Sequence, residues 1–314
     1  MKKIFLILLI SITSVNIHSN TLVNNELKNF IKNNHIHTGY SEKELIGIFY
    51  DVEINNEILK KMDNQPESKI YYSRYESWFI NKKNIKEGKN FIKKNINILR
   101  KAELKFGVPY EIIAAIIGVE TRYGNILGKH RIIDSLSTLS FFYERRKNFF
   151  QSELKNYLIL TKRENLNPLN LKGSYAGAMG YGQFMPSSYL SFGVDGNSDG
   201  TINLYDVNDA ILSIGNYLNK NGWKSGEYII SEMKLRKNNN KNILNKSLKP
   251  NITIYKVRKN GYYDKLVFNK KDYYVGLNNF YTITKYNRSR MYALVVFKLA
   301  KEISDRNKKY YKFK

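Results

Sequence analysis

The chain has 314 residues, of which 42% are hydrophobic and 25% are charged, so it can bury a sizeable core and is not disordered by composition. No internal apolar run approaches 18 residues, which excludes a polytopic membrane protein. The sequence contains no cysteine, which excludes disulfides, thiolate metal sites, cysteine nucleophiles and a lipidated N-terminal cysteine.

The formal net charge is +25, which favours a polyanionic partner such as nucleic acid, an anionic membrane or an acidic wall polymer. Lysine, asparagine, isoleucine and tyrosine are all abundant, as expected of an AT-rich genome. No block of lysine and arginine resembles a nucleic-acid-binding motif. Charge alone therefore does not identify the partner.

Residues 1–19 have the pattern of a secretory signal peptide. Lys2 and Lys3 supply the positive start, and residues 4–12 form an apolar stretch too short to span a bilayer comfortably. The alternative is an uncleaved N-terminal anchor. In either case we expect an exported, periplasmic protein, and a cytosolic nucleic-acid partner is not expected.

Residues 20–105 are predicted to form an N-terminal helical region. Ser41 followed three residues later by Glu44 is a capping box, which predicts a helix over 42–50. Apolar residues at helical spacing predict a longer helix over 84–104.

Three further helices are predicted after Gly107. The most apolar one covers 109–123, with Pro109 in its first turn. Two more are expected over 133–143 and 145–164.

A glycine-rich segment with five glycines covers residues 169–193 and predicts loops with short helical turns. A helix capped by Asp206 is then expected over 206–221.

The character of the chain changes between residues 224 and 276. Short runs of valine, isoleucine, tyrosine and phenylalanine alternate with turn residues there, which predicts a small β-rich insertion with runs at 252–257 and 265–268. Residues 289–304 return to a helical pattern.

Glu120 lies on the apolar stripe of the helix over 109–123, four residues after Ile116 and three after Ile117. A carboxylate at such a position is either paired or protonated over part of the physiological pH range. Burial without a cation raises the pKa of a glutamate and makes it a general acid. The alternative is a structural ion pair with Arg122 or Arg131.

The glycine-rich segment supplies the side chains that a sugar site uses. Aromatic rings stack on sugar faces, while amide and hydroxyl groups fix the orientation of the ligand. With one acid nearby, this set favours glycosidic-bond chemistry over acyl or phosphoryl transfer. The glycines starting at Gly177 also resemble a phosphate loop, but the lysine and the preceding strand are missing. The candidate side chains are Ser174, Tyr175, Gln183, Phe184 and Tyr189.

Residues 195–206 fit the twelve-residue EF-hand calcium loop, with a glycine at the sixth position and an apolar residue at the eighth. The twelfth position is aspartate in place of glutamate, and its shorter side chain weakens a bidentate contact. The alternative is a polar turn without metal. We expect structural Ca²⁺ and no organic cofactor, with Asp195, Asn197, Asp199, Thr201, Asn203 and Asp206 as the metal ligands.

Three segments carry a family resemblance. Residues 118–124 (GVETRYG), 172–189 (KGSYAGAMGYGQFMPSSY) and 286–289 (YNRS) resemble the membrane-bound lytic murein transglycosylase B family, of the glycoside hydrolase family 103 type. The match runs in order over about residues 70–302. The lipobox cysteine of the lipoprotein members is absent, so the chain resembles a soluble exported form.

The resemblance implies an α+β, mainly α fold with a lysozyme-like catalytic core. It implies cleavage of the MurNAc–GlcNAc β-1,4 bond of peptidoglycan, with Glu120 as the catalytic residue. Glu120 would protonate the leaving oxygen and then accept the proton of the MurNAc C6 hydroxyl, which attacks C1 and leaves a 1,6-anhydro end. A calcium site in the 195–206 loop is also implied.

The resemblance further implies which side chains bind substrate. Alternatives remain open for some of them. Arg145 and Arg146 would also fit a solvated helix start, and any single tyrosine could instead pack in the core. The implied residues are Ser174, Gln183 and Phe184 beside Glu120, Tyr217 against the acid or the sugar, Tyr286, Asn287 and Tyr292 on the opposite wall, and Arg145 and Arg146 at stem-peptide carboxylates.

Peptidoglycan glycan strands are the expected partner, with peripheral association with the membrane or with other wall enzymes as a further possibility. A hydrolytic muramidase on the same scaffold and a non-catalytic wall-binding protein are the alternative functions. The expected domains are a signal peptide at 1–19, a helical region at 20–105, a catalytic core at 106–223 and 277–314, and a β-rich insertion at 224–276.

Overall fold

The computed structural model describes residues 16–64, 71–232, 248 and 274–304. Helices dominate these residues, and the described strands are short, so the predicted mainly α composition is confirmed. No helix among the described residues has the length and hydrophobicity that crossing a bilayer requires. Most of the predicted signal segment, and the runs at 252–257 and 265–268, lie outside the described residues.

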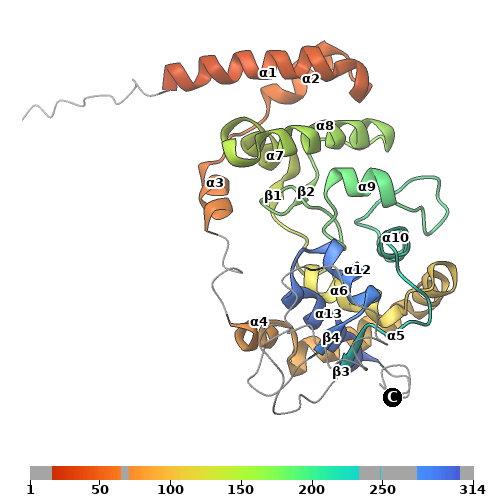
Figure 1. Cartoon of the computed structure of the whole chain (residues 1–314). Coiled ribbons are helices and arrows are strands. Elements are labelled where there is room, and N and C mark those ends of the chain that lie inside the picture. The colour runs from red at the N-terminus through yellow and green to blue at the C-terminus, as the bar shows by residue number, and fades with distance from the viewer. Residues whose placement is uncertain (1–15, 65–70, 233–247, 249–273, 305–314) are drawn as a thin grey trace, which may run out of the picture.

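The upper part of the molecule in Figure 1 is a helical layer in which α7 and α8 pack against each other and α1 lies across them. Phe30 of α1 contacts Phe49 of α2 and Phe141 of α7 edge to face, with ring centroids 6.0 Å apart in both pairs. The helices of this layer are α1 (Asn16–Thr38), α2 (Glu42–Tyr50), α3 (Asn56–Asp63), α7 (Ile132–Phe142), α8 (Lys147–Arg163) and α9 (Pro186–Phe192).

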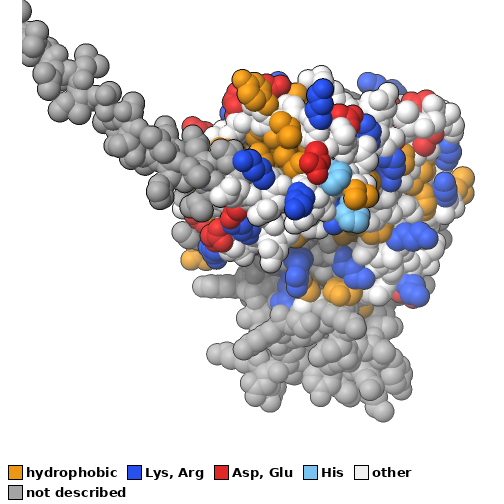
Figure 2. All heavy atoms as spheres, turned by 90° about the horizontal axis from the view of Figure 1, so that it is seen from above, with side chains coloured by type: hydrophobic (Ala, Val, Ile, Leu, Met, Phe, Trp, Pro, Cys, Tyr) orange, Lys and Arg blue, Asp and Glu red, His pale blue; other side chains and the backbone are white. Residues whose placement is uncertain are grey.

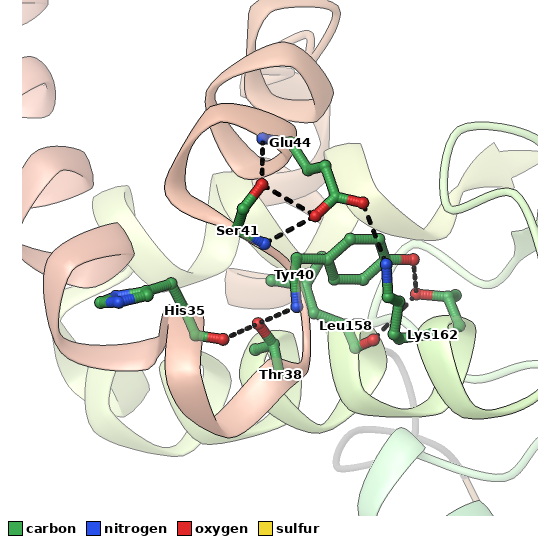
Figure 3. A network of polar contacts seen from close by, with 8 residues as sticks. His35, Thr38, Tyr40, Ser41, Glu44, Leu158 and Lys162 are labelled. Carbon is green, nitrogen blue, oxygen red and sulfur yellow. Dashed lines mark hydrogen bonds and ion pairs between the residues drawn. The ribbon is translucent and has the colours of Figure 1, made fainter.

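The junction of α1 and α2 is held by the predicted capping box. Ser41 N donates to Glu44 Oε2 at 2.6 Å, and Glu44 N donates to Ser41 Oγ at 3.2 Å, so α2 begins where the sequence predicts. From α8, Lys162 Nζ donates to Glu44 Oε1 at 2.9 Å, and Thr161 Oγ1 accepts from the Tyr40 hydroxyl at 3.2 Å (Figure 3). One carboxylate therefore caps α2 and joins it to α8.

The lower part of the molecule is built around α6, whose neighbours are α5 and α13 (Figure 1). Ile112, Ile113, Ile116 and Ile117 are all fully buried, which makes α6 the central helix of the core. The helices here are α4 (Tyr72–Phe79), α5 (Lys82–Phe106), α6 (Tyr110–Thr121), α10 (Val207–Lys220), α12 (Asn278–Tyr286) and α13 (Arg290–Ile303).

The ends of α6 differ from the prediction. Pro109 is the N-cap residue and not a member of the first turn. The helix ends at Thr121 because Arg122 and Tyr123 have φ angles of 52° and 59°, in the left-handed region. Glu120 therefore lies in the last turn of the helix.

Two antiparallel strand pairs join distant parts of the chain. The strand β1 (His130–Arg131) pairs with β2 (Lys172–Gly173), in the register His130 with Gly173. The strand β3 (Ile230–Glu232) pairs with β4 (Tyr274–Gly276), which brings together the two ends of the predicted insertion. The helix α12 that follows β4 was not predicted from the sequence.

The basic excess is dispersed on the face that carries α1 and α2. Figure 2 shows lysine and arginine side chains scattered among neutral and acidic groups, without a continuous basic block. This distribution agrees with compositional bias as the source of much of the charge.

The Glu44 network predicts a pH-dependent contribution to stability. The hydrogen bond from Ser41 N, together with Lys162, lowers the pKa of Glu44 from 4.5 to about 2. A lowered pKa means that stabilisation is present above pH 4.5 and is lost as the pH falls toward 2. We expect Glu44→Gln to lower the Tm at pH 7, and the gap to wild type to close between about pH 4.5 and 2 in circular dichroism melts. A gap that stays constant over this range would contradict the assignment.

Candidate active site

Glu120 is half-buried in the last turn of α6, and a tyrosine from α13 holds it. The hydroxyl of Tyr292 donates to Glu120 Oε1 at 2.7 Å. Tyr292 is buried, and this burial, together with the nearby Glu120 carboxylate, raises the pKa of the phenol well above 10. The hydroxyl therefore keeps its proton and acts as a donor to the carboxyl group at physiological pH.

The two arginines considered as ion-pair partners of Glu120 have other contacts. Arg131 Nε donates to Asp134 Oδ2 at 2.6 Å, within the first turn of α7. The Arg122 guanidinium lies 5.1 Å from the centroid of the Phe79 ring. Both contacts are favourable in their own right, so neither arginine depends on Glu120 for a partner.

An aromatic cluster lies next to the Tyr292 contact. The rings of Tyr286 and Tyr292 are nearly parallel, with centroids 6.4 Å apart and an interplanar angle of 5°. Tyr217 of α10 lies 4.8 Å from Tyr286, and Phe184 lies 5.7 Å from Tyr286 and 5.8 Å from Tyr217. Four of the predicted binding residues therefore form one cluster, which Tyr292 links to Glu120.

The hydroxyls of two of these tyrosines hold the backbone. Tyr286 donates to Gly182 O at 2.6 Å, and Tyr217 donates to Lys285 O at 2.7 Å. Burial raises the pKa of Tyr286 well above its usual value and that of Tyr217 to about 12, so both phenols remain protonated. These bonds fix the glycine-rich segment and the end of α12 relative to α10.

The glycine-rich segment is tied directly to the helix that carries Glu120. Thr121 Oγ1 donates to Tyr181 O at 3.0 Å. Ser174 Oγ accepts from Ala178 N at 3.0 Å, and Gln183 Nε2 donates to Gly180 O at 3.0 Å. Ser174 and Gln183 thus shape the loop in addition to their predicted contact with substrate.

The remaining predicted binding residues lie at helix ends. Asn287 is the C-cap residue of α12, next to Tyr286. Arg145 and Arg146 form a 3₁₀ turn (Glu144–Arg146) between α7 and α8, and both are exposed. Arg145 lies 3.8 Å from Asp63, and the Arg146 guanidinium lies 4.3 Å from the Phe149 ring centroid. The contacts of these arginines belong to the upper helical layer.

The 195–206 loop has the backbone turn that an EF-hand needs. Gly200, at the sixth position, has a φ of 89°, which favours glycine. Asp195 accepts hydrogen bonds from Ser198 N at 2.6 Å and from Gly200 N at 2.9 Å. Asp199 accepts from the backbone and hydroxyl of Thr201, which lowers its pKa. These hydrogen bonds hold both carboxylates within the loop, and oxygen donors of this kind suit Ca²⁺.

Asp206, the predicted twelfth ligand, has a structural role. Its Oδ1 accepts from Asn208 N at 2.8 Å and from Asp209 N at 3.3 Å, as the N-cap of α10. Among the described residues, no three His, Cys, Asp or Glu side chains gather in a group suited to a metal ion. The predicted site therefore depends on the amide oxygens of Asn197 and Asn203 and on the carbonyl of Thr201 as well.

Two buried carboxylates that support these loops were missed in the sequence. Asp209 accepts from Gly196 N at 2.8 Å and from Asn203 N at 2.6 Å, so it joins the two sides of the metal loop. Glu153, which is 4% exposed, accepts from Ser187 N at 2.9 Å at the start of α9. In the sequence, their positions in predicted helices do not distinguish them from surface acids, because only the structure shows which loops they contact.

The close approach of Gly182 and Tyr286 provides a test of the packing in this cluster. A Cβ on Gly182 would lie 2.7 Å from Tyr286 Oη. We expect Gly182→Ala to displace the tyrosine and to destabilise the protein by about 1–3 kcal/mol, measured by urea unfolding. Gly47→Ala in α2 is the matched control, because its added Cβ meets no atom within 4 Å. The control should stabilise by about 0.5–1 kcal/mol; equal effects of the two changes would contradict the packing.

Comparison with known proteins gives the family. The protein-family model described as "Transglycosylase SLT domain" matches residues 23–301 of this chain. Membrane-bound lytic murein transglycosylase B of Escherichia coli (strain K12) is 38% identical over 289 residues, which cover 85% of this chain and 79% of that protein.

Solved structures agree with this match. Soluble lytic transglycosylase SltB1 of Pseudomonas aeruginosa is 38% identical with a TM-score of 0.84, over 88% of this chain and 98% of that chain. The Escherichia coli lytic transglycosylase Slt35 in complex with calcium is also 38% identical, with a TM-score of 0.78 over 88% of this chain and 92% of that chain. The predicted lysozyme-like fold class is thereby confirmed. The matched stretch contains Glu120 and the whole tyrosine cluster, and the chain belongs to the lytic murein transglycosylases of the Transglycosylase SLT domain family.

Proposed function

We propose that this protein is exported to the periplasm and cleaves the MurNAc–GlcNAc β-1,4 bond of peptidoglycan by intramolecular transglycosylation. The observation that carries the proposal is the contact between Tyr292 and Glu120 at the end of a buried helix. This contact supports the role of Glu120 as a general acid, because the fold orients its carboxyl group beside an aromatic cluster that suits sugar rings.

In the proposed reaction, Glu120 gives its proton to the bridging oxygen as the bond from that oxygen to MurNAc C1 breaks. The carboxylate then accepts the proton of the MurNAc C6 hydroxyl, whose oxygen bonds to C1. The products are a free GlcNAc 4-hydroxyl and a 1,6-anhydroMurNAc end, and Glu120 is protonated again. The hydroxyl belongs to the substrate and has a high effective concentration, so it competes with water.

The roles of the surrounding residues follow from their contacts. Tyr292 holds Oε1 of Glu120, which leaves the acid proton to Oε2 and fixes the direction of proton transfer. The rings of Tyr217 and Tyr286 would pack against sugar faces, because their hydroxyls are engaged with backbone carbonyls. Phe184, which is 3% exposed, would act from beneath by supporting these two rings. We assign Ser174, Gln183 and Asn287 to sugar amides and hydroxyls, and Arg145 and Arg146 to the carboxylates of the stem peptide.

Replacement of the acid tests the catalytic assignment. We expect Glu120→Gln to lower the release of soluble fragments from purified sacculi by about 10²–10⁴-fold, since general acid–base catalysis contributes that much. Glu57→Gln, at an exposed glutamate of α3, should keep wild-type activity. The fragments are analysed by mass spectrometry. Anhydro ends support transglycosylation, whereas reducing ends would identify a hydrolytic muramidase. Equal solubilisation by wild type and Glu120→Gln would exclude Glu120 as the catalyst.

We also propose that the 195–206 loop binds Ca²⁺ as a structural ion. The side chains of Asp195, Asn197 and Asp199, the carbonyl of Thr201 and the side chain of Asn203 would hold it, with Asp206 capping α10 beside it. The similarity to Slt35, which has been solved with calcium, supports the choice of ion. Bound Ca²⁺ would neutralise the loop carboxylates and hold the start of α10, the helix that carries Tyr217.

Calcium removal tests this site independently of activity. At Ca²⁺ a hundred times above its Kd, binding stabilises the folded protein by about 2.7 kcal/mol. We therefore expect calcium to raise the Tm by several degrees and a chelator to reverse the rise. Asp199→Ala should abolish the response, while Asp63→Ala, outside the loop, should preserve it. An unchanged Tm together with no bound calcium in isothermal titration would refute the site.

A further inference from the structure

One face of α5 carries a polar stripe that the proposed active site does not use. Lys83, Glu87, Asn90 and Lys94 follow one another at intervals of three or four residues, so they share a side of the first part of α5. Lys101 comes seven residues later, beyond a kink at Asn95, and its Nζ donates to Gly196 O at 3.1 Å. Lys83, Asn90, Lys94 and Lys101 are exposed, and Glu87 is half-buried. The stripe extends for about 27 Å at the usual helical rise of 1.5 Å per residue.

Three hollows of about 640, 250 and 330 Å³ lie along this stripe. Glu87 and Asn125 line both the first and the second, and Lys94 and Asn95 line both the second and the third. Neighbouring hollows share lining residues and so lie side by side along α5, and we call the three together the α5 groove. Its other lining residues on the α4 and α5 side include Trp78, Lys83, Asn84 and Lys101.

The opposite wall of the α5 groove comes from segments near the active site. Arg122, Asn125 and Ile126 follow directly after α6, and Asn208 lies in the first turn of α10. Tyr181 comes from the glycine-rich segment. The groove therefore passes the end of the helix that carries Glu120. None of the residues proposed for catalysis or sugar binding lines any of the three hollows.

The lining is rich in amides and cations. Seven asparagines contribute, and four cationic side chains stand against a single carboxylate, that of Glu87. An amide both donates and accepts, which suits the hydroxyl and N-acetyl groups of a glycan. Lysines suit carboxylates, such as those of peptides attached to the strand. Trp78, which is 37% exposed, offers a ring to a sugar face.

Asn84 lines the first hollow, but its side-chain amide is buried and committed to the protein. Its side chain is 1% exposed, and its Nδ2 donates to Phe79 O at 2.6 Å. Its Oδ1 has no hydrogen-bond partner among the described residues. Because this oxygen is inaccessible, Asn84 offers no acceptor to a ligand in the hollow and instead holds the start of α5 against Phe79.

We propose that the α5 groove is an accessory binding site for the glycan strand of peptidoglycan, with the lysines on the strand's peptide carboxylates. The choice of peptidoglycan as the polymer that binds there rests on the proposed function. An open groove of this length suits a strand more than a single sugar. Nucleic acid, the other polyanion, fits less well, because a strand with a charge on every nucleotide needs more cations than the four that Glu87 partly offsets, whereas glycan hydroxyls and N-acetyl groups suit the asparagines of the lining.

The sequence of α5 provides a matched pair of charge reversals. Lys83→Glu with Lys94→Glu changes two lysines of the groove. Lys86→Glu with Lys93→Glu changes two exposed lysines of the same helix that lie outside it. Both double variants have the same net charge, and both are made in the Glu120→Gln background so that the strands stay intact. Circular dichroism melts establish that each variant is folded.

Binding to purified sacculi is measured by co-sedimentation. We expect the groove variant to bind at least tenfold more weakly than its parent and the control variant to bind within twofold of it. Equal losses in both, or no loss in either, would overturn the proposal. A loss of DNA binding with sacculus binding retained would also overturn it and assign the groove to nucleic acid. Co-sedimentation measures binding without turnover, so it tests the groove alone. The proposed reaction is tested separately by the analysis of anhydro ends.

Discussion

The site depends on the hydrogen bond between the Tyr292 hydroxyl and Glu120 Oε1, which joins residues 172 positions apart in the chain. Each partner is placed by a helix of the core, since α6 and α13 pack against each other and most of their apolar residues are buried. The position of the carboxyl group is therefore set by the packing of the core and not by a mobile loop. This placement supports the catalytic role proposed for Glu120, because a carboxyl group held by the core needs no rearrangement to present the same oxygen.

The tyrosines near Glu120 have structural contacts, and they are also the residues proposed to bind sugar. Tyr286 and Tyr217 donate their hydroxyls to Gly182 O and Lys285 O, as structural residues do. Their rings nevertheless form one cluster with Phe184. The bonds that stabilise the fold thus also fix the orientation of the aromatic rings, so the sugar contacts proposed for these rings would depend on the packing of the core.

The elements of the fold that could be predicted from the sequence are those that local patterns determine. The capping box at Ser41 fixes the start of α2 because both partners lie within one turn. The helix α12 was missed because it has nine residues and no side-chain cap at Leu277. The acid at position 120 follows from helical periodicity and family resemblance. Its contact with Tyr292 requires the packing of α6 against α13, which no local pattern encodes.

The lysines of α5 show why charge must be considered together with packing. In the sequence, Lys83 and Lys94 are equivalent to Lys86 and Lys93: all four are exposed lysines on one helix. Lys83 and Lys94 differ from the other two in that the segment after α6 and the start of α10 form a second wall along their side of α5. Lys83 also lies 4.0 Å from Glu87. A cation beside such a wall meets a ligand that is already partly desolvated, whereas a cation on an open surface meets one that is screened by water and salt. A net charge of +25 therefore leaves the partner undetermined, while two charges in a groove are enough to favour one.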